Sequence, residues 1–254
     1  MTMPPSQAGT GPGSVLILGA MSDIGRAIAR AYAGAGRPLI LAARDHARLA
    51  DDAEDLRIRS GVEVRTVEFD VLDTAGHGAF LDALGGLPDT VVCVVGLLGD
   101  QARSEAEWPA AELVMRTNYL GPASILGEIA GRMAARGRGT IIGIGSVAGD
   151  RGRASNYVYG SAKAGFAAFL SGLRNRLFRR GVRVVTVKPG FVDTRMTRGM
   201  DLPKLLTAQP EEVAAAVLRA EARGRDVVYV RSVWRLVMTV IRLLPEGVFK
   251  RTRL

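Results

Sequence analysis

Tyr159 and Lys163 are the two side chains of this sequence whose types and spacing most directly suggest chemistry. They begin and end the segment Tyr-Gly-Ser-Ala-Lys, and residues four positions apart share one face of a helix. An ammonium beside a phenol favours the phenolate, which lowers the phenol pKa from its ordinary value of about 10. A phenol tuned in this way can act as a general acid and base. Tyr157 has no such partner, because Ser161 stands four residues after it.

Two further polar side chains are candidates for the same reaction. Ser146 precedes Tyr159 by thirteen residues and follows the apolar run 140–144, and its hydroxyl can hold a substrate oxygen. Asn118 lies in a stretch expected to be helical, where asparagine costs some helix propensity. Its side chain is suited to anchoring a water molecule against the Lys163 ammonium. Together these four residues would hold a substrate oxygen and move a proton to or from it.

A glycine-rich turn, Gly19-Ala-Met-Ser-Asp-Ile-Gly25, directly follows the first apolar run of the chain. Glycines let the backbone approach a pyrophosphate, and a helix N-terminus offers unpaired N–H groups and a positive dipole end. The turn therefore predicts a dinucleotide site that includes Ser22, Asp23 and Ile24 besides the two glycines. Asp23 stands where a middle glycine is usual, and we interpret it as a helix cap that points away from the phosphates. Ser22 is the alternative cap, or a ligand of a phosphate or ribose oxygen.

The end of the second apolar run indicates which dinucleotide is bound. An acidic residue about 20 positions after the turn would bind a free ribose 2′-hydroxyl, but the chain has Ala43 and Arg44 there. A guanidinium can pair with a 2′-phosphate and stack on adenine, so NADP(H) is favoured over NAD(H). Asp45 is interpreted as the cap of the next helix. Asp70 is placed to accept a hydrogen bond from the adenine amino group.

These residues need a regular series of elements to position them. Seven apolar runs are typical of buried parallel strands: 15–18, 38–42, 62–67, 90–95, 140–144, 182–187 and 226–230. Between them lie helical patterns: 23–33, 45–59, 74–84, 108–136 with a break near Gly121-Pro122, 155–180 and 210–222. The alternation implies right-handed crossovers. It predicts an α/β fold with one domain, a Rossmann-type doubly wound parallel sheet of seven strands with helices on both faces.

Composition limits the class of protein. The chain has 254 residues, 48% of them hydrophobic, which suits one core-forming domain, placed at 14–230. Residues 1–13 are rich in Pro, Gly and small polar residues and are predicted to be a disordered tail instead of a signal peptide. The single cysteine, Cys93, reads as a buried strand residue of a cytoplasmic protein. We expect neither a metal site nor a membrane-spanning helix, which would need about 18 uncharged apolar residues.

The net charge of +9 is concentrated in the last tenth of the chain, where 231–254 holds six basic residues and one acidic residue. A helix over 232–244 would place Trp234, Val237, Met238 and Ile241 on one side. Its polar stripe would be narrow and formed by Arg231, Arg235, Thr239 and Arg242. Such a segment can lie on an anionic membrane, or pack over the substrate cleft or a subunit, and we favour burial. Nucleic acid is not expected, because no stacking aromatics lie between the charges.

The motifs taken together resemble the short-chain dehydrogenase/reductase family over residues 15–195. In that family an Asn, a Ser, a Tyr and a Lys form a catalytic tetrad, and the Lys also holds the nicotinamide ribose. The resemblance implies these roles for Asn118, Ser146, Tyr159 and Lys163. It also implies cofactor contacts by Tyr159, Lys163, Pro189, Gly190, Val192 and Thr194. Most members read Asn-Asn-Ala-Gly where this chain has Cys-Val-Val-Gly96, which puts the cofactor geometry around Gly96 in question more than the catalysis.

Three segments are similar to the decaprenylphosphoryl 2-keto-erythro-pentose reductase branch of that family: Gly-Leu-Leu-Gly-Asp100, the block that ends at Lys163, and the tail from Trp234. The similarity implies NADPH-dependent reduction of a polyprenyl-phosphoryl 2-keto-pentose to the arabinose form. It further implies a flavin-dependent oxidase as partner. The wider family resemblance implies a homodimer or homotetramer, and the basic tail allows contact with the inner membrane face. Two alternatives stay open: a reductase of another hydrophobic ketone, fatty-acyl or steroid-like, and a dinucleotide-binding regulator without turnover.

Overall fold

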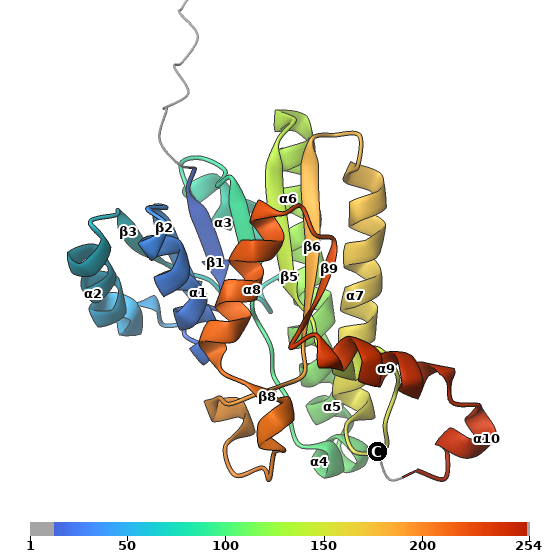
Figure 1. Cartoon of the computed structure of the whole chain (residues 1–254). Helices are drawn as coiled ribbons and strands as arrows, with labels where there is room; N and C mark the ends of the chain where they lie inside the picture. The colour runs from blue at the N-terminus through green and yellow to red at the C-terminus, as the bar shows by residue number, and fades with distance from the viewer. Residues whose placement is uncertain (1–12, 253–254) are drawn as a thin grey trace, which may run out of the picture.

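The computed structural model describes residues 13–252 and has at its centre a parallel sheet of seven strands in the order β3-β2-β1-β4-β5-β6-β9 (Figure 1). The strands are β1 (Val15–Leu18), β2 (Leu39–Ala43), β3 (Val64–Glu68), β4 (Thr90–Cys93), β5 (Gly139–Ile144), β6 (Val182–Pro189) and β9 (Val227–Val230). All seven predicted strands are confirmed to within two residues at most of their bounds. The predicted tail lies outside the described residues, except for Gly13.

Two layers of helices cover the sheet and explain why its central strands are apolar without interruption. One layer contains α1 (Asp23–Gly34), α2 (Ala50–Ser60) and α8 (Pro210–Ala222). The opposite layer contains α3 (His77–Ala83), α6 (Gly121–Arg136) and α7 (Tyr157–Leu177). In β1, Val15 and Ile17 pack into the first core, and Leu16 and Leu18 into the second. The doubly wound α/β fold is thereby confirmed.

The long helical pattern over 108–136 differs from the prediction. Helix α5 (Trp108–Met115) continues through a wide, π-helical turn at Arg116–Leu120 directly into α6. The predicted break near Gly121-Pro122 is wrong, since the irregularity precedes that pair and the helix path is unbroken. The Asn118 side chain supplies a reason, because its amide donates to the Val114 carbonyl at 2.8 Å and competes with the backbone ladder.

Several small elements gather beyond the carboxyl ends of the strands, at the lower end of the molecule in Figure 1. They are α4 (Gln101–Ala106), the short pair β7 (Phe191–Val192) and β8 (Thr207–Ala208), α9 (Val233–Leu243) and α10 (Glu246–Phe249). Only α9 corresponds to a predicted segment. The strand order reverses between β1 and β4, and such a reversal opens a crevice at this end of a parallel sheet. The small elements therefore surround the place where a ligand is expected.

Two predictions from composition can be compared with the structure. Cys93 is buried in β4, and burial raises the pKa of its thiol to about 11, as expected for an inert strand cysteine. Between residues 13 and 252, no helix is both long enough and apolar enough to cross a lipid bilayer.

Candidate active site

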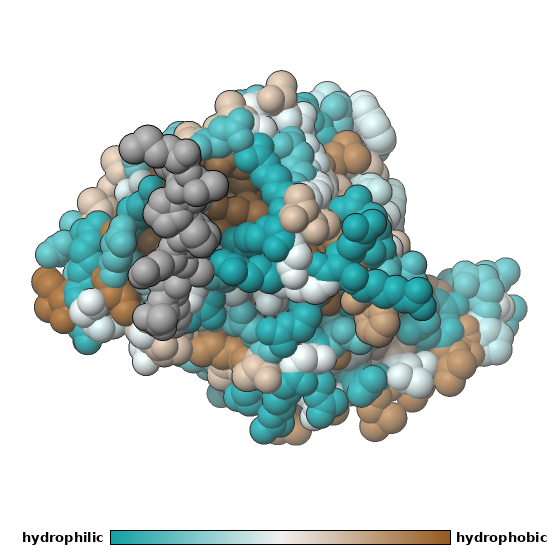
Figure 2. Space-filling model, turned by 90° about the horizontal axis from the view of Figure 1, so that it is seen from above, coloured by the Kyte–Doolittle hydropathy of each residue, from teal (hydrophilic) through white to brown (hydrophobic). Residues whose placement is uncertain are grey.

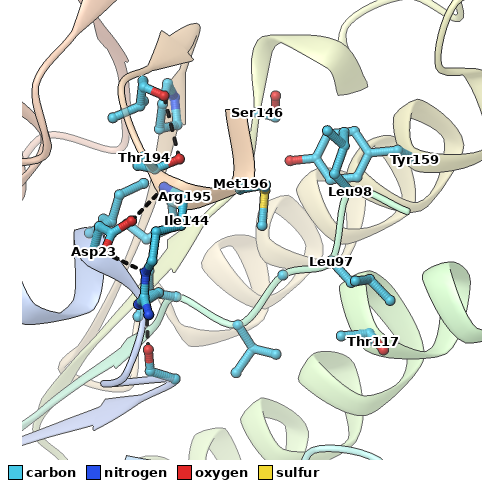
Figure 3. A pocket seen from close by; sticks show the side chains of 18 of the residues that line it. Asp23, Leu97, Leu98, Thr117, Ile144, Ser146, Tyr159, Thr194, Arg195 and Met196 are labelled. Carbon is cyan, nitrogen blue, oxygen red and sulfur yellow. Dashed lines mark hydrogen bonds and ion pairs between the residues drawn. The ribbon is translucent and has the colours of Figure 1, made fainter. Parts of the chain in front are cut away.

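The catalytic end of the crevice is formed by the loop after β5 and the first turns of α7. Two glycines let these segments touch: a Cβ at Gly149 would lie 2.7 Å from the Ala164 nitrogen, and one at Gly160 would lie 2.9 Å from the Ala148 oxygen. Ser146 Oγ accepts a hydrogen bond from the Ala148 N–H at 3.1 Å, which leaves its own proton free to be donated. Figure 3 shows Ser146 and Tyr159 on the wall of the same pocket.

The protonation of Tyr159 is controlled by its burial. Burial raises the pKa of Tyr159 to about 12, and the Ser146 hydroxyl acts in the opposite direction. Lys163 Nζ lies 5.8 Å from the centroid of the Tyr159 ring. The prediction that the ammonium lowers the phenol pKa is wrong for this structure, because desolvation is the largest effect. Tyr159 therefore keeps its proton throughout the neutral range, as an acid that donates to a substrate oxygen requires.

The Lys163 and Asn118 side chains both lie next to Gly96. The Lys163 side chain is buried and donates to the Ile144 carbonyl at 3.2 Å, and burial lowers the pKa of its ammonium to about 8. Asn118 is also buried, and its Oδ1 accepts from the Leu97 N–H at 3.2 Å. A Cβ at Gly96 would lie 3.2 Å from Asn118 Oδ1 and 3.5 Å from Lys163 Nζ. Glycine at this position thus keeps the amide and the ammonium close together.

The glycine-rich turn lies against the end of β4, across the reversal point of the sheet. Gly19 has a φ of +90°, and a Cβ there would lie 3.0 Å from the Val95 nitrogen. Ser22 caps α1, since its Oγ accepts from the Gly25 N–H at 3.0 Å and donates to the Gly19 oxygen at 2.9 Å. The interpretation of Asp23 as the cap is therefore wrong, and the alternative cap, Ser22, is confirmed.

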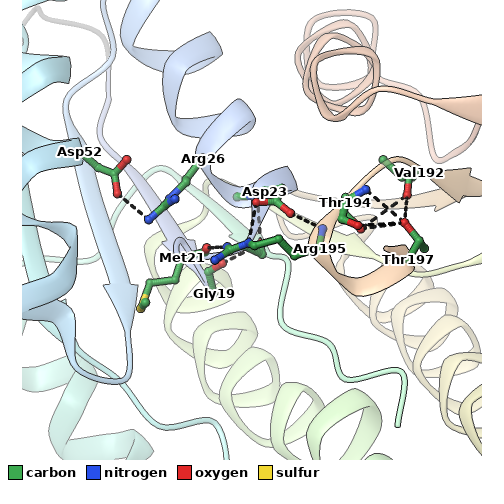
Figure 4. Close-up of polar contacts among 11 residues, drawn as sticks. Gly19, Met21, Asp23, Arg26, Asp52, Val192, Thr194, Arg195 and Thr197 are labelled. Atoms are coloured by element: carbon green, nitrogen blue, oxygen red, sulfur yellow. Dashed lines mark hydrogen bonds and ion pairs between the residues drawn. The ribbon is translucent and has the colours of Figure 1, made fainter. Parts of the chain in front are cut away.

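Asp23 instead binds Arg195, which lies 172 residues away in the sequence. Its carboxylate accepts from the Arg195 backbone N–H at 2.7 Å and from Nε at 2.9 Å, and the same guanidinium donates to the Met21 carbonyl (Figure 4). The pair neutralises a carboxylate beside the predicted phosphate site. It also joins the loop that carries Thr194 and Thr197 to the glycine-rich turn.

The adenosine side of the crevice carries two arginines, Arg44 and Arg48. Arg44 is exposed and, within residues 13–252, takes part in no ion pair. Asp45 has a left-handed backbone, with a φ of +54°, and its side chain makes no capping hydrogen bond to the described residues. The interpretation of Asp45 as a cap is wrong, because Glu68, opposite Ala43 in the sheet, accepts from the Asp45 and His46 N–H groups instead.

Helix α9 packs against the loop that follows β6. A Cβ at Gly190 would lie 1.9 Å from Trp234 Nε1, so any side chain there would clash with the indole. The indole N–H donates to the Leu206 carbonyl at 3.0 Å, and its ring meets Phe191 edge-on at 5.3 Å. Trp234, Met238 and Ile241 are buried in one small core, which confirms that this side of the segment packs against the protein itself.

A single cleft of about 1050 Å³ brings the predicted residues together. All the predicted site residues line it except Gly25, the last residue of the glycine-rich turn, and Asn118, which is buried beside Gly96. Sequence reasoning missed an apolar group on its wall: Leu97, Leu98, Leu113, Phe191, Met196 and Met200. It also missed polar residues of the lining, among them Arg48, Arg153, Asn156 and Arg195. For Arg153 and Asn156, a position between Ser146 and Tyr159 was the available signal.

Comparison with known proteins identifies a family and several relatives. Residues 14–204 match the family model described as short chain dehydrogenase. An uncharacterized oxidoreductase of Mycobacterium tuberculosis is 44% identical over 245 residues, which cover 95% of this chain and 98% of the relative. A short-chain dehydrogenase from Sphingobium yanoikuyae in complex with NADPH has a TM-score of 0.79 at 27% identity, covering 95% of this chain and 96% of that one. The bulky-bulky ketone specific alcohol dehydrogenase from Comamonas testosteroni has a TM-score of 0.77 at 25% identity, covering 96% of both chains.

Proposed function

Because the chain belongs to the short-chain dehydrogenase family of oxidoreductases that interconvert ketones and secondary alcohols, we propose that it acts as an NADPH-dependent ketone reductase. The observation that carries this proposal is the state of Tyr159. The half-buried Tyr159 phenol lines the cleft beside the Ser146 hydroxyl, and desolvation raises its pKa to about 12, so it can donate its proton to a nascent alkoxide. The direct test is the oxidation of NADPH by the purified protein with a panel of ketones.

The crevice suits a dinucleotide. At Gly19 and Gly25 a side chain would meet backbone atoms of the protein at 3.0 Å and 2.7 Å, so glycine lets the turn pack this tightly, as the turn of a dinucleotide site requires. The start of α1 adds unpaired N–H groups and a positive dipole end. Asp23, the one carboxylate of the turn, is bound to Arg195. A dinucleotide held here supplies the hydride for reduction.

Four side chains handle the oxygen and the proton. Ser146 has a free hydroxyl proton and holds the substrate oxygen, which stabilises the negative charge that develops there. Tyr159 donates its proton to that oxygen. Lys163 binds the nicotinamide ribose and, with Asn118 behind Gly96, returns a proton to the phenolate. The short distances of Lys163 and Asn118 to a Cβ at Gly96 support their acting together.

The cofactor preference rests on Arg44, and we expect Arg44→Asp to raise the KM for NADPH about 100-fold. The variant loses a charge-assisted hydrogen bond to the 2′-phosphate and gains a repulsive charge. The KM for NADH should change by less than about threefold, because NADH carries no phosphate there. Steady-state kinetics with both cofactors measure the difference. Arg59→Asp is the control, since it makes the same charge change on the exposed face of α2. An equal increase in the KM for both cofactors would show that Arg44 does not bind the 2′-phosphate.

For the substrate we propose a polyprenyl-phosphoryl 2-keto-pentose, reduced at C2 to the arabinose form. The apolar wall around Leu98 and Met196 supports a substrate with a hydrocarbon portion. A ketone of this kind arises by oxidation of a secondary alcohol, and a flavin-dependent oxidase is the proposed source. NADPH oxidation with this substrate, beside fatty-acyl and steroid-like ketones, is the test. A higher kcat/KM for a simple ketone would overturn the assignment.

We further propose that α9 contacts an anionic membrane surface. Besides its buried side, the helix exposes a second apolar stripe at helical spacing: Val233, Leu236, Val240 and Leu243. Leu236 is 68% exposed and Leu243 77% exposed, and Arg235 and Arg242 lie beside them on the same helix. Figure 2 shows apolar side chains on the surface of the lobe that α9 and α10 form at the right of the molecule. Apolar groups flanked by cations are suited to an anionic bilayer.

Liposome flotation tests this contact. We expect the full-length chain to float with vesicles of phosphatidylglycerol and not with phosphatidylcholine, because each basic residue near an anionic surface contributes about 1 kcal/mol. The double variant Leu236→Glu, Leu243→Glu should remain at the bottom of the gradient. Ile58→Glu, which places the same change at an exposed apolar residue of α2, should float like the original chain. Equal flotation of all three would leave α9 as a packing element alone.

A further inference from the structure

Arg153 is a cation of the catalytic cleft that no residue between 13 and 252 neutralises. It lies in the loop between Ser146 and Tyr159 and lines the same cleft. Among the described residues it forms no ion pair, and its Nε is buried with no hydrogen-bond partner. Burial lowers the pKa of Arg153, although a guanidinium keeps its charge in proteins. A buried donor left unsatisfied costs free energy, so the Arg153 Nε–H is suited to binding a ligand.

Arg151, two positions earlier on the same loop, has a structural role. It binds Glu246 at 2.9 Å and the Leu244 carbonyl at 2.7 Å, and its guanidinium stacks on the Phe249 ring. These contacts anchor the loop to the C-terminal segment. Arg153 makes no comparable contact within residues 13–252, although it belongs to the same loop. A purely structural role therefore does not account for it.

Asn156 provides a second unsatisfied group on the same wall. It occupies the N-cap position of α7, where an asparagine side chain ordinarily accepts a hydrogen bond from the first turn. In the part of the chain that the structure describes, this side chain makes no capping bond, and its buried Oδ1 has no partner. An acceptor kept free in this way can receive a hydrogen bond from a substrate hydroxyl. Arg153 and Asn156 are thus one cationic donor and one acceptor, both close in sequence to Tyr159.

The position of Arg153 separates it from the cofactor. The predicted pyrophosphate site lies at the turn after β1, where Arg195 binds Asp23, and the predicted 2′-phosphate site lies after β2 at Arg44. Arg153 follows β5 with Ser146, and therefore belongs to the end of the cleft where the substrate reacts. The same cleft is also lined by apolar side chains, among them Leu97 and Met196, and apolar surroundings strengthen an ion pair.

We propose that Arg153 binds an anionic phosphate group of the substrate, while Asn156 accepts a hydrogen bond from a hydroxyl beside the ketone. This inference rests on the proposed reductase function and assigns the side chains that would recognise the phosphate and the hydroxyl of its substrate. The phosphate could belong to a lipid-linked sugar or to a small free sugar phosphate. Both sources present the same chemistry to the guanidinium, and they differ in the hydrocarbon portion that follows.

Calorimetric titration of the full-length protein tests the site without turnover. The probes are n-decyl phosphate, its uncharged dimethyl ester and inorganic phosphate. We expect n-decyl phosphate to bind at least about tenfold more tightly than the ester, because hydrogen bonds to charged groups are the stronger ones. Arg153→Met should remove this preference, Arg153→Lys should keep part of it, and Arg59→Met should leave it unchanged. Comparable affinity for inorganic phosphate would indicate a free sugar phosphate, and weak binding of it a lipid phosphate.

Kinetics with paired ketones test the same residue during reaction. The kcat/KM of Arg153→Met should decrease about 10- to 100-fold for ribulose 5-phosphate and change less than about threefold for ribulose. Equal losses for both ketones, or tight binding of decyl phosphate by Arg153→Met, would overturn the inference. If the original chain reduces no ketone while calorimetry still shows a phosphate preference that depends on Arg153, the reductase proposal fails and the anion site stands.

Discussion

Replacing Tyr159 with phenylalanine is expected to lower kcat for ketone reduction by about 100- to 10,000-fold, the range that a general acid contributes. The substitution removes one oxygen and its proton and leaves the ring packed as before. Binding of NADPH should weaken only slightly, because the variant loses one implied cofactor contact, the Tyr159 hydroxyl, while the glycine-rich turn and Arg44 are untouched. Stopped-flow fluorescence of NADPH binding and steady-state oxidation of NADPH give the two values on the same preparation.

Tyr157→Phe is the matched control. Tyr157 lies on the same helix two residues earlier, is exposed, and has Ser161 instead of a lysine four residues later. We expect its kcat to stay within about twofold of the original, as for surface substitutions. If Tyr159→Phe kept full activity, the enzyme interpretation would fail and a dinucleotide-binding regulator would become the better account.

Lys163→Met should inactivate the protein and stabilise it at the same time. Below pH 8 the ammonium is charged in the folded and the unfolded chain, so the folded state carries the full cost of burying it. Methionine fills the same space without a charge. We expect the free energy of unfolding at pH 7 to rise by about 1 to 3 kcal/mol, after allowing for the lost hydrogen bond to the Ile144 carbonyl. The kcat should decrease by about two orders of magnitude.

The stability gained by Lys163→Met is expected to decrease as the pH rises. Burial lowers the pKa of Lys163 from 10.5 to about 8, so between these values the unfolded chain binds more protons than the folded one. The original protein therefore gains stability from this group as the pH rises through that interval, and the advantage of the variant shrinks. Urea unfolding of both proteins at pH 7 and pH 10 measures the difference. An advantage that is equal at both pH values would show that packing, and not charge, is responsible.

The strands were predictable because a parallel sheet covered on both faces requires uninterrupted apolar runs, and these stand out in β1 and β4. The helix through Asn118 was less predictable. Gly121 and Pro122 are strong local signals of a break, but the irregularity comes from a side-chain hydrogen bond of Asn118 to Val114. Such competition with the backbone depends on packing around the side chain, which sequence patterns do not report.

The candidate site was likewise predictable only in part. Residues of short motifs, such as Tyr159 with Lys163, were predictable from their spacing together with the neighbouring motifs, and they line one cleft in the structure. Contacts between distant segments were missed, because no local pattern links Asp23 to Arg195 or Gly190 to Trp234. The protonation of Tyr159 was predicted in the wrong direction, since its sign depends on burial, and burial is a property of the whole fold.

The packing of Trp234 on Gly190 provides an intrinsic optical reporter of the cleft. The indole is 4% exposed and touches the loop that would meet the nicotinamide, so its emission responds to movement of that loop. The second indole of the chain, Trp108, is 66% exposed and accessible to iodide. Iodide quenching therefore separates the two emissions, and ligand binding can be followed without attaching a dye.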